Sequence, residues 1–127
     1  MKISLPEDNI FVIICSMEWQ IIYYNSKLEK EILNLPDGLL ARYLRLTDLL
    51  LEFGSNLGLP HTKSMGNGLF ELRVKSKEGT ARVFFCTKIN KKIIMLHSFI
   101  KKSQKTPKKE IKIAQNRMSE VMKNETL

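Results

Sequence analysis

The stretch LGLPHTKSMGNGLFELRVKSKEGTARVFFCTKINKKIIMLHSFIKKSQKTPKK, residues 57–109, decides the fold of this 127-residue chain. In residues 70–75 apolar side chains alternate with charged ones, a pattern typical of a half-buried strand. Two short turns separate this segment from residues 80–88 and 93–99, which are also rich in strand-forming side chains. Because short turns join antiparallel neighbours, the stretch predicts three consecutive antiparallel strands.

Side-chain alternation assigns residues of these strands to the two faces of the predicted sheet. On the middle strand Arg82 and Phe84 lie on one face. On the last strand His97 shares a face with Met95 and Phe99. One face is therefore expected to carry basic and titratable side chains.

Two helices are predicted ahead of these strands. Residues 19–24 are aromatic and β-branched, as in a first strand, and Asn25 or Ser26 is suited to cap a helix that ends before a Leu-Pro-Asp-Gly turn. Residues 39–53 carry apolar side chains at helical spacing, and Gly54 supplies the end of this second helix.

A last helix is predicted after Thr106, a good N-cap residue, and Pro107, which suits the first helical position. The predicted order is β-α-α-β-β-β-α. This order describes an α+β domain in which paired helices pack on an antiparallel sheet.

The positive charge is concentrated in the second half of the chain. Residues 1–60 hold five Lys and Arg against eight Asp and Glu, whereas residues 61–127 hold sixteen against five, for a formal net charge of +8. Clustered basic residues of this kind are typical of a surface that binds nucleic acid. The alternative is a basic surface that only aids solubility.

The sequence offers no pattern for a metal or a cofactor. His61 and His97 are the only histidines, and no carboxylate pair brackets either of them. Cys15 and Cys86 lie far apart and match no metal or redox spacing, which favours the reducing cytoplasm.

No membrane or export segment is expected either. The longest apolar run, residues 10–15, is too short to span a bilayer, and Glu7 and Asp8 stand where a signal peptide would be basic. We therefore expect a cytoplasmic protein.

Three strings occur in order along the chain: LPHTKSMGNGLFELR, ARVFF and MLHSFIKKSQKTPKKEI. Together they resemble the phage-derived HigB-type branch of the RelE/ParE superfamily, the toxins of bacterial type II toxin–antitoxin systems. The resemblance runs from about residue 17 to about residue 122 and implies a RelE-like domain over residues 17–127. Members of this branch begin just ahead of the first strand, so residues 1–16 are expected to be an extension or a start-site artefact, with Met17 as the alternative start.

This resemblance implies a ribosome-dependent endoribonuclease, an mRNA interferase that cleaves in the A site. In such enzymes the 2′-hydroxyl attacks the adjacent phosphate without a metal. The matching positions assign Arg73 and Arg82 to the phosphate, and Lys63 and His97 to proton transfer, with the acid and the base left open. The alternatives are strand arginines that pair with Glu71 or Glu78, and a histidine that only packs.

Five further residues are candidates for contacts with the substrate. His61 contacts RNA or is part of a turn, and Phe84 stacks a base or is a core residue. Lys101, Lys102 and Lys105 follow phosphates or form a solvated basic run.

Two other functions remain open. One is a ParE-like toxin that inhibits DNA gyrase without nuclease activity, and the other is a non-toxic nucleic-acid-binding module or a decayed phage relic. For a HigB-type toxin the expected partners are the ribosome, mRNA and a small helix-turn-helix antitoxin like HigA, with operator DNA contacted only through the antitoxin complex. The predicted helix at residues 39–53 and the last helix are the expected antitoxin contacts.

Overall fold

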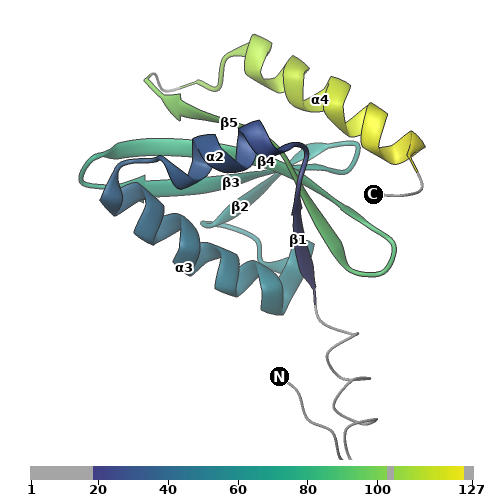
Figure 1. Cartoon of the computed structure of the whole chain (residues 1–127), viewed down its shortest axis with the longest axis horizontal. Coiled ribbons are helices and arrows are strands. Elements are labelled where there is room, and N and C mark those ends of the chain that lie inside the picture. Colours follow the sequence, from purple (N-terminus) through teal and green to yellow (C-terminus); the bar gives the residue numbers. More distant parts are fainter. Residues whose placement is uncertain (1–18, 103–104, 125–127) are drawn as a thin grey trace, which may run out of the picture.

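The computed structural model describes residues 19–102 and 105–124. The elements in chain order are β1 (Gln20–Tyr23), α2 (Ser26–Leu33), α3 (Asp37–Phe53), a 3-10 turn (Gly54–Asn56), β2 (Thr62–Gly66), β3 (Leu69–Ser76), β4 (Gly79–Lys88), β5 (Lys92–Lys101) and α4 (Lys108–Lys123). Three helices thus surround a five-stranded sheet, with α2 and α3 on one face and α4 on the other (Figure 1). The predicted α+β, RelE-like fold class is confirmed, with β2 added to the predicted order. The expectations for Cys15 and residues 1–16 lie outside the described part.

The sheet has the strand order β1-β5-β4-β3-β2. The pairs β2–β3, β3–β4 and β4–β5 are antiparallel, as predicted for the turns that join them, whereas β1 pairs with β5 in parallel. The sheet is therefore mixed. The chain leaves β1 through α2 and α3 before it returns, and this long connection makes the parallel pairing at the edge possible.

Side-chain caps and a glycine define ends of helices α2 and α3. The Asn25 side chain accepts a hydrogen bond of 2.8 Å from the Leu28 backbone N–H, which confirms Asn25 as the cap of α2. Gly54 ends α3 with φ of +59°, as predicted. At the start of α3, Glu78 Oε1 accepts from the backbone N–H groups of Gly38 and Leu39, so the β3–β4 turn is tied to that helix.

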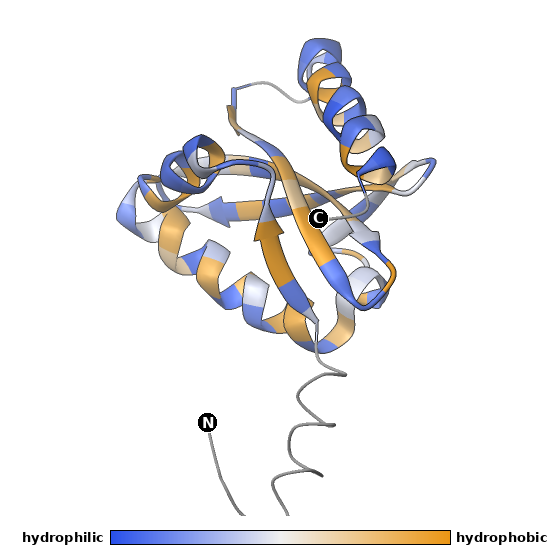
Figure 2. Cartoon of the chain, turned by 45° about the vertical axis from the view of Figure 1, so that its right-hand side comes forward, coloured by the Kyte–Doolittle hydropathy of each residue, from blue (hydrophilic) through white to orange (hydrophobic). Residues whose placement is uncertain are grey.

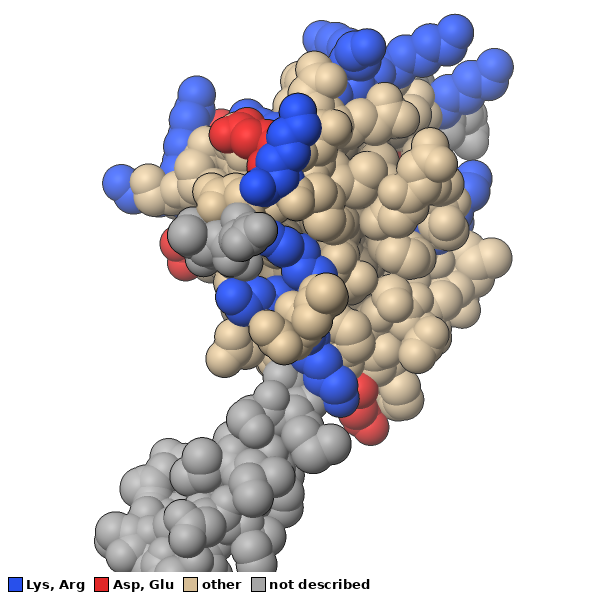
Figure 3. All heavy atoms as spheres, turned by 90° about the vertical axis from the view of Figure 1, so that its right-hand side faces the viewer, with Lys and Arg blue, Asp and Glu red and all other residues tan. Residues whose placement is uncertain are grey.

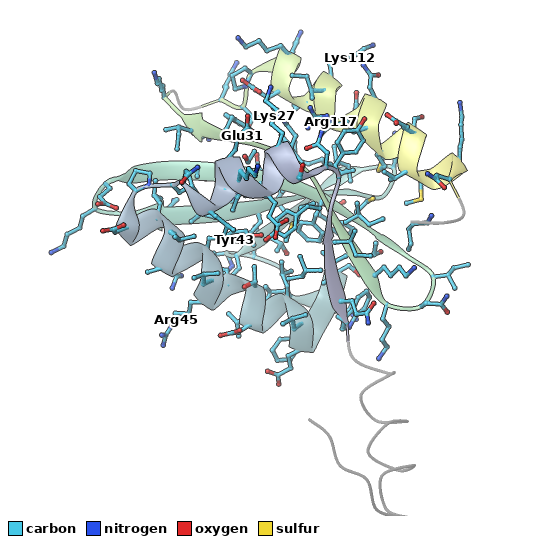
Figure 4. The ribbon with its side chains drawn as sticks, in the orientation of Figure 1. Lys27, Glu31, Tyr43, Arg45, Lys112 and Arg117 are labelled. Atoms are coloured by element: carbon cyan, nitrogen blue, oxygen red, sulfur yellow. The ribbon has the colours of Figure 1, made fainter. Side chains whose placement is uncertain are left out.

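Each face of the sheet carries its own apolar core. Figure 2 shows apolar residues along β1 and β5 and an alternation of polar and apolar residues along the helices. The first core lies under α2 and α3, where Tyr43 points from α3 toward the sheet and shares a 2.8 Å hydrogen bond with Tyr23 (Figure 4). The second core lies under α4, whose Ala114 and Val121 are fully buried against Leu96 and its neighbours.

A β-bulge in β5 changes the predicted faces of that strand. Phe84 is opposite His97, but Phe85 is opposite Met95, so Leu96 is one extra residue in β5. Met95 packs in the core under α2 and α3, while His97 lies on the α4 face. The prediction that His97 shares a face with Met95 is therefore wrong, because a bulge shifts the alternation by one residue.

Helix α4 starts one residue later than predicted. Pro107 occupies the N-cap position, and no side chain caps the helix. Thr106 does not cap α4 as expected, because its hydroxyl donates a 2.9 Å hydrogen bond to Glu71 Oε2 on β3. None of the helices within the described residues is long and apolar enough to cross a membrane.

Candidate active site

The candidate residues lie in neighbouring rows that cross the α4 face of the sheet. Cross-strand partners share a face, and Lys63, Glu71, Phe84 and His97 are successive partners on β2, β3, β4 and β5. Strands are spaced by about 4.8 Å, so the backbones of Lys63 and His97 are roughly 14 Å apart at the two ends of this row.

The next row places two cations side by side. Arg73 on β3 is the partner of Arg82 on β4, which in turn is opposite Phe99 on β5. Two adjacent guanidinium groups repel each other unless a negative charge lies between them or binds to them. This row is therefore suited to hold an anion such as a phosphate group.

Glu71 supplies the resident negative charge. It is 3% exposed, and its Oε1 atom lies 3.5 Å from Nε of both Arg73 and Arg82. Its other oxygen accepts the hydrogen bond from Thr106. Arg82 is itself only 4% exposed, and its Nε has no hydrogen-bond partner among the described residues, because the contact with Glu71 is an ion pair without hydrogen-bond geometry.

Burial and charge act together on Arg82 and Lys101. Burial lowers the pKa of Arg82; Glu71 opposes this shift and Arg73 adds to it. Burial also lowers the pKa of Lys101, and the nearby Arg82, Arg73 and Lys75 lower it further against the effect of Glu71. Lys101 therefore belongs electrostatically to the same cluster as the two arginines.

His97 is held by the start of α4. Its Nε2 atom lies 2.6 Å from Oε1 of Glu110, and both side chains are mostly buried. A carboxylate only accepts hydrogen bonds, so an ionised Glu110 requires a hydrogen on Nε2 of His97. In the neutral ring Nδ1 is then the acceptor, whereas a protonated ring donates from both nitrogens. The ring also stacks on Phe99, with a centroid distance of 6.2 Å.

Beside these rows an open hollow of about 440 Å³ borders the site. Five residues line it: Arg42, Pro60, His61, Arg73 and Lys75. Arg73 thus belongs both to the cross-strand rows and to the hollow. Among the described residues that line it, none is acidic.

Positive charge alone does not mark this site. The side of the molecule with the β4–β5 turn and the end of α4 also carries Lys and Arg, arranged around an uncharged area (Figure 3). What distinguishes the α4 face is the buried Glu71 and the two arginines that converge on it. Within the described ranges, 19–102 and 105–124, no group of three or more His, Cys, Asp or Glu is placed to hold a metal.

A family model described as Phage derived protein Gp49-like (DUF891) matches residues 30–119, most of the chain. The chain belongs to this Gp49-like family. The family is toxin-like, of the RelE/Gp49 type, which is consistent with the toxin of a toxin–antitoxin pair and implies an antitoxin partner. No curated protein matches the chain.

In this Gp49-like chain the four predicted catalytic residues face the same side of the sheet. Lys63 is exposed on β2, Arg73 is partly exposed, and Arg82 is buried rather than exposed. Of the two pairings considered for the arginines, the one with Glu71 is present, whereas Glu78 contacts the start of α3 instead.

Of the predicted substrate contacts, Phe84 is a core residue. It shares the face of Arg82 as predicted, but its ring is fully buried under α4 and stacks on Phe99 at 5.9 Å, so it has no surface to offer a base. Lys102 and Lys105 are exposed on either side of residues 103–104, which lie outside the described part, and their phosphate contacts stay a prediction.

Glu71 was considered from the sequence only as a possible partner of the strand arginines, and the structure places its Oε1 atom 3.5 Å from Nε of both. Phe99 and Glu110 were not predicted as site residues. Alternation along residues 93–99 places Phe99 on the face of His97, but its position opposite Arg82 depends on the strand register. The sequence carries no signal for Glu110 at the site, because its contact with His97 depends on how α4 docks.

Proposed function

We propose that this Gp49-like toxin is a HigB-type, ribosome-dependent endoribonuclease that cleaves mRNA in the A site without a metal. One observation carries the proposal: Lys63, Arg73, Arg82 and His97 come from four strands and lie in two adjacent rows on one face. A protein that only binds gyrase has no need of two proton-transfer groups that flank a pair of arginines, so the interferase is favoured over the ParE-like function.

The proposed reaction is an internal transfer at phosphorus. A base takes the proton of the 2′-hydroxyl, the 2′-oxygen forms a bond to phosphorus, and the bond from phosphorus to the 5′-oxygen breaks. An acid gives a proton to the leaving 5′-oxygen, which yields a 2′,3′-cyclic phosphate and a 5′-hydroxyl. Negative charge grows on the phosphate oxygens between these steps and requires nearby cations.

Arg73 is the residue best suited to hold those oxygens directly. Its side chain is 28% exposed, against 5% for Arg82. Arg82, behind it, adds positive charge in a buried setting, where electrostatic effects are larger than in water. Lys101, whose lowered pKa reflects burial and the same cations, contributes from β5.

Lys63 and His97 are proposed as the proton-transfer pair, one as acid and one as base. They stand at the two ends of the same cross-strand row, so the proposal places one on each side of the scissile phosphate. His97 is oriented by Glu110 through Nε2, and in the neutral ring Nδ1 is the acceptor. Lys63 is exposed on the edge strand β2.

The experiment that tests this function is primer extension on a defined mRNA, with and without programmed ribosomes and with a chelator present throughout. Cuts inside codons that need the ribosome and persist with the chelator are the expected result. A protein that stops growth but makes no cuts would contradict the proposal and shift the target to gyrase. A small helix-turn-helix antitoxin, HigA-like, is the proposed partner, and its co-purification with the chain tests that separately.

A further inference from the structure

The hollow next to the cross-strand rows is built from three separate parts of the chain. Arg42 comes from α3, Pro60 and His61 from the loop before β2, and Arg73 and Lys75 from β3. Its volume of about 440 Å³ falls within the range of small-molecule sites. It therefore has the size for one nucleotide, and it opens to the surface.

The backbone that presents His61 is fixed by hydrogen bonds. The N–H groups of His61 and Thr62 both donate to the Gly58 carbonyl, at 3.1 and 3.0 Å, and the His61 carbonyl accepts from Arg73 N–H at 2.8 Å. The loop is thus anchored to β3 directly beside Arg73. A wall held in this way binds a ligand with little further ordering.

Two of the three cations that line the hollow have no protein counter-charge among the described residues. Arg73 is paired with Glu71, but no carboxylate in the described ranges forms a salt bridge with Arg42 or Lys75. Cations gathered in a concave surface attract an anion because their fields add there. The guanidinium of Arg42 and the ammonium of Lys75 are suited to phosphate oxygens.

We propose that this hollow, bounded by Arg42, His61 and Lys75, is a second RNA subsite that holds the nucleotide next to the one at Arg73. The inference rests on the proposed function and deepens it by naming where the flanking RNA lies. Arg73 and Lys75 are two residues apart on one strand, about 6.6 Å, which is comparable to the separation of neighbouring phosphates on a single strand. The His61 ring offers a flat surface on which the base stacks, and Pro60 adds apolar surface beside it.

Binding of a fluorescein-labelled 2′-O-methyl RNA to the full chain, followed by anisotropy, tests this subsite. This RNA has no free 2′-hydroxyl, so it cannot be cleaved, and the readout does not depend on nuclease activity. Replacing Arg42 or Lys75 by Ala is expected to raise the Kd about fivefold or more. The slope of log Kd against log salt concentration is expected to fall by about one, as for the loss of one phosphate contact.

Arg45→Ala is the matched control. Arg45 is one turn along α3 from Arg42, is exposed and points away from the body of the protein (Figure 4). Its loss removes the same charge from the same helix but not from the hollow, so the Kd is expected to change less than twofold. Circular dichroism checks that each variant is folded. If Arg42→Ala does not fold, the test rests on Lys75→Ala, which changes an exposed residue.

The outcomes separate this inference from the proposed function. If the Arg42 and Lys75 variants bind like Arg45→Ala, or if the wild-type chain does not bind the RNA, the hollow is not an RNA subsite, even when ribosome-dependent cleavage is observed. If Arg42 and Lys75 matter for binding but the wild-type chain makes no ribosome-dependent cuts, the subsite stands and the interferase proposal fails.

Discussion

Arg73 and Arg82 stand directly opposite each other on β3 and β4. Their Nε atoms lie at the same distance, 3.5 Å, from one oxygen of Glu71, yet their exposures differ several-fold. Arg73 is partly exposed and can contact a substrate. Arg82 is buried, and its ion pair with Glu71 stabilises the fold around the carboxylate. The two arginines are therefore expected to respond differently to the same substitution.

Arg73→Ala is expected to lower the cleavage rate about 100-fold or more while the protein stays folded. The change removes a donor to the developing phosphate charge, and a single such donor is worth about this factor. The rate of ribosome-dependent cleavage, from primer extension over time, measures the effect. Lys77→Ala, in the exposed β3–β4 turn, is the control, and equal rates for the two variants would remove Arg73 from the site.

Arg82→Ala is expected to lose both activity and stability. Removal of this side chain leaves Glu71 buried with only Arg73 and Thr106 as partners, and breaking a buried ion pair costs about 3 kcal/mol. Urea unfolding of the wild type, Arg82→Ala and Arg73→Ala measures the difference. A fully stable Arg82→Ala variant would contradict the structural role given to this arginine.

Glu71→Gln removes the negative charge of the carboxylate but keeps the shape of the side chain. The amide fills the same space but leaves Arg82 without its counter-charge, so the free energy of unfolding is expected to fall by about 2 to 3 kcal/mol. Glu52→Gln, an exposed change on α3, is expected to stay within about 0.5 kcal/mol of the wild type. An equal effect of the two changes would show that Glu71 does not compensate the arginines.

Cys86 makes stability sensitive to alkaline pH. Burial raises the pKa of this thiol from 9.0 to about 11, so the unfolded chain releases the proton at lower pH than the folded one. The contribution of Cys86 is complete below pH 9 and is lost as the pH rises from 9 toward about 11. Above pH 10 the buried Tyr43, whose pKa burial also raises, adds to the loss.

Urea unfolding at pH 8, 9 and 10 measures how the free energy of unfolding falls as the pH rises. The wild type is expected to lose about 1 kcal/mol between pH 8 and 10 through Cys86, and Cys86→Ala is expected to lack that part of the slope although it is less stable throughout. An unchanged slope in Cys86→Ala would show that other groups cause the alkaline loss.

The sequence predicted those parts of the fold that leave a local pattern. Alternation in residues 70–75 identified β3 and its charged face, and Asn25 and Gly54 marked helix ends correctly. Strand β2 was missed because residues 62–66 have no alternation of their own, and this edge strand is specified by its pairing with β3.

Features that depend on tertiary packing could not be predicted. Because of the bulge at Leu96, His97 and Met95 lie on different faces of the sheet. No local sequence pattern indicates this bulge. Arg42 and Arg73 meet at one hollow although they are far apart in sequence. The catalytic candidates came from the family resemblance. The sequence alone could not show that Glu71 lies within 3.5 Å of both arginines or that a hollow borders Arg73.

Gly54→Ala tests how the end of α3 packs on the start of the described chain. A Cβ at Gly54, where φ is +59°, would lie 2.3 Å from the Trp19 ring, so the substitution adds a clash with a rigid side chain to the strain of a left-handed backbone. The free energy of unfolding is expected to fall by about 3 kcal/mol. Gly68→Ala is the control, since Gly68 also has positive φ but open space around its Cβ position, and it is expected to cost about 1 kcal/mol. Equal losses for the two variants in urea unfolding would show that Trp19 does not pack on Gly54.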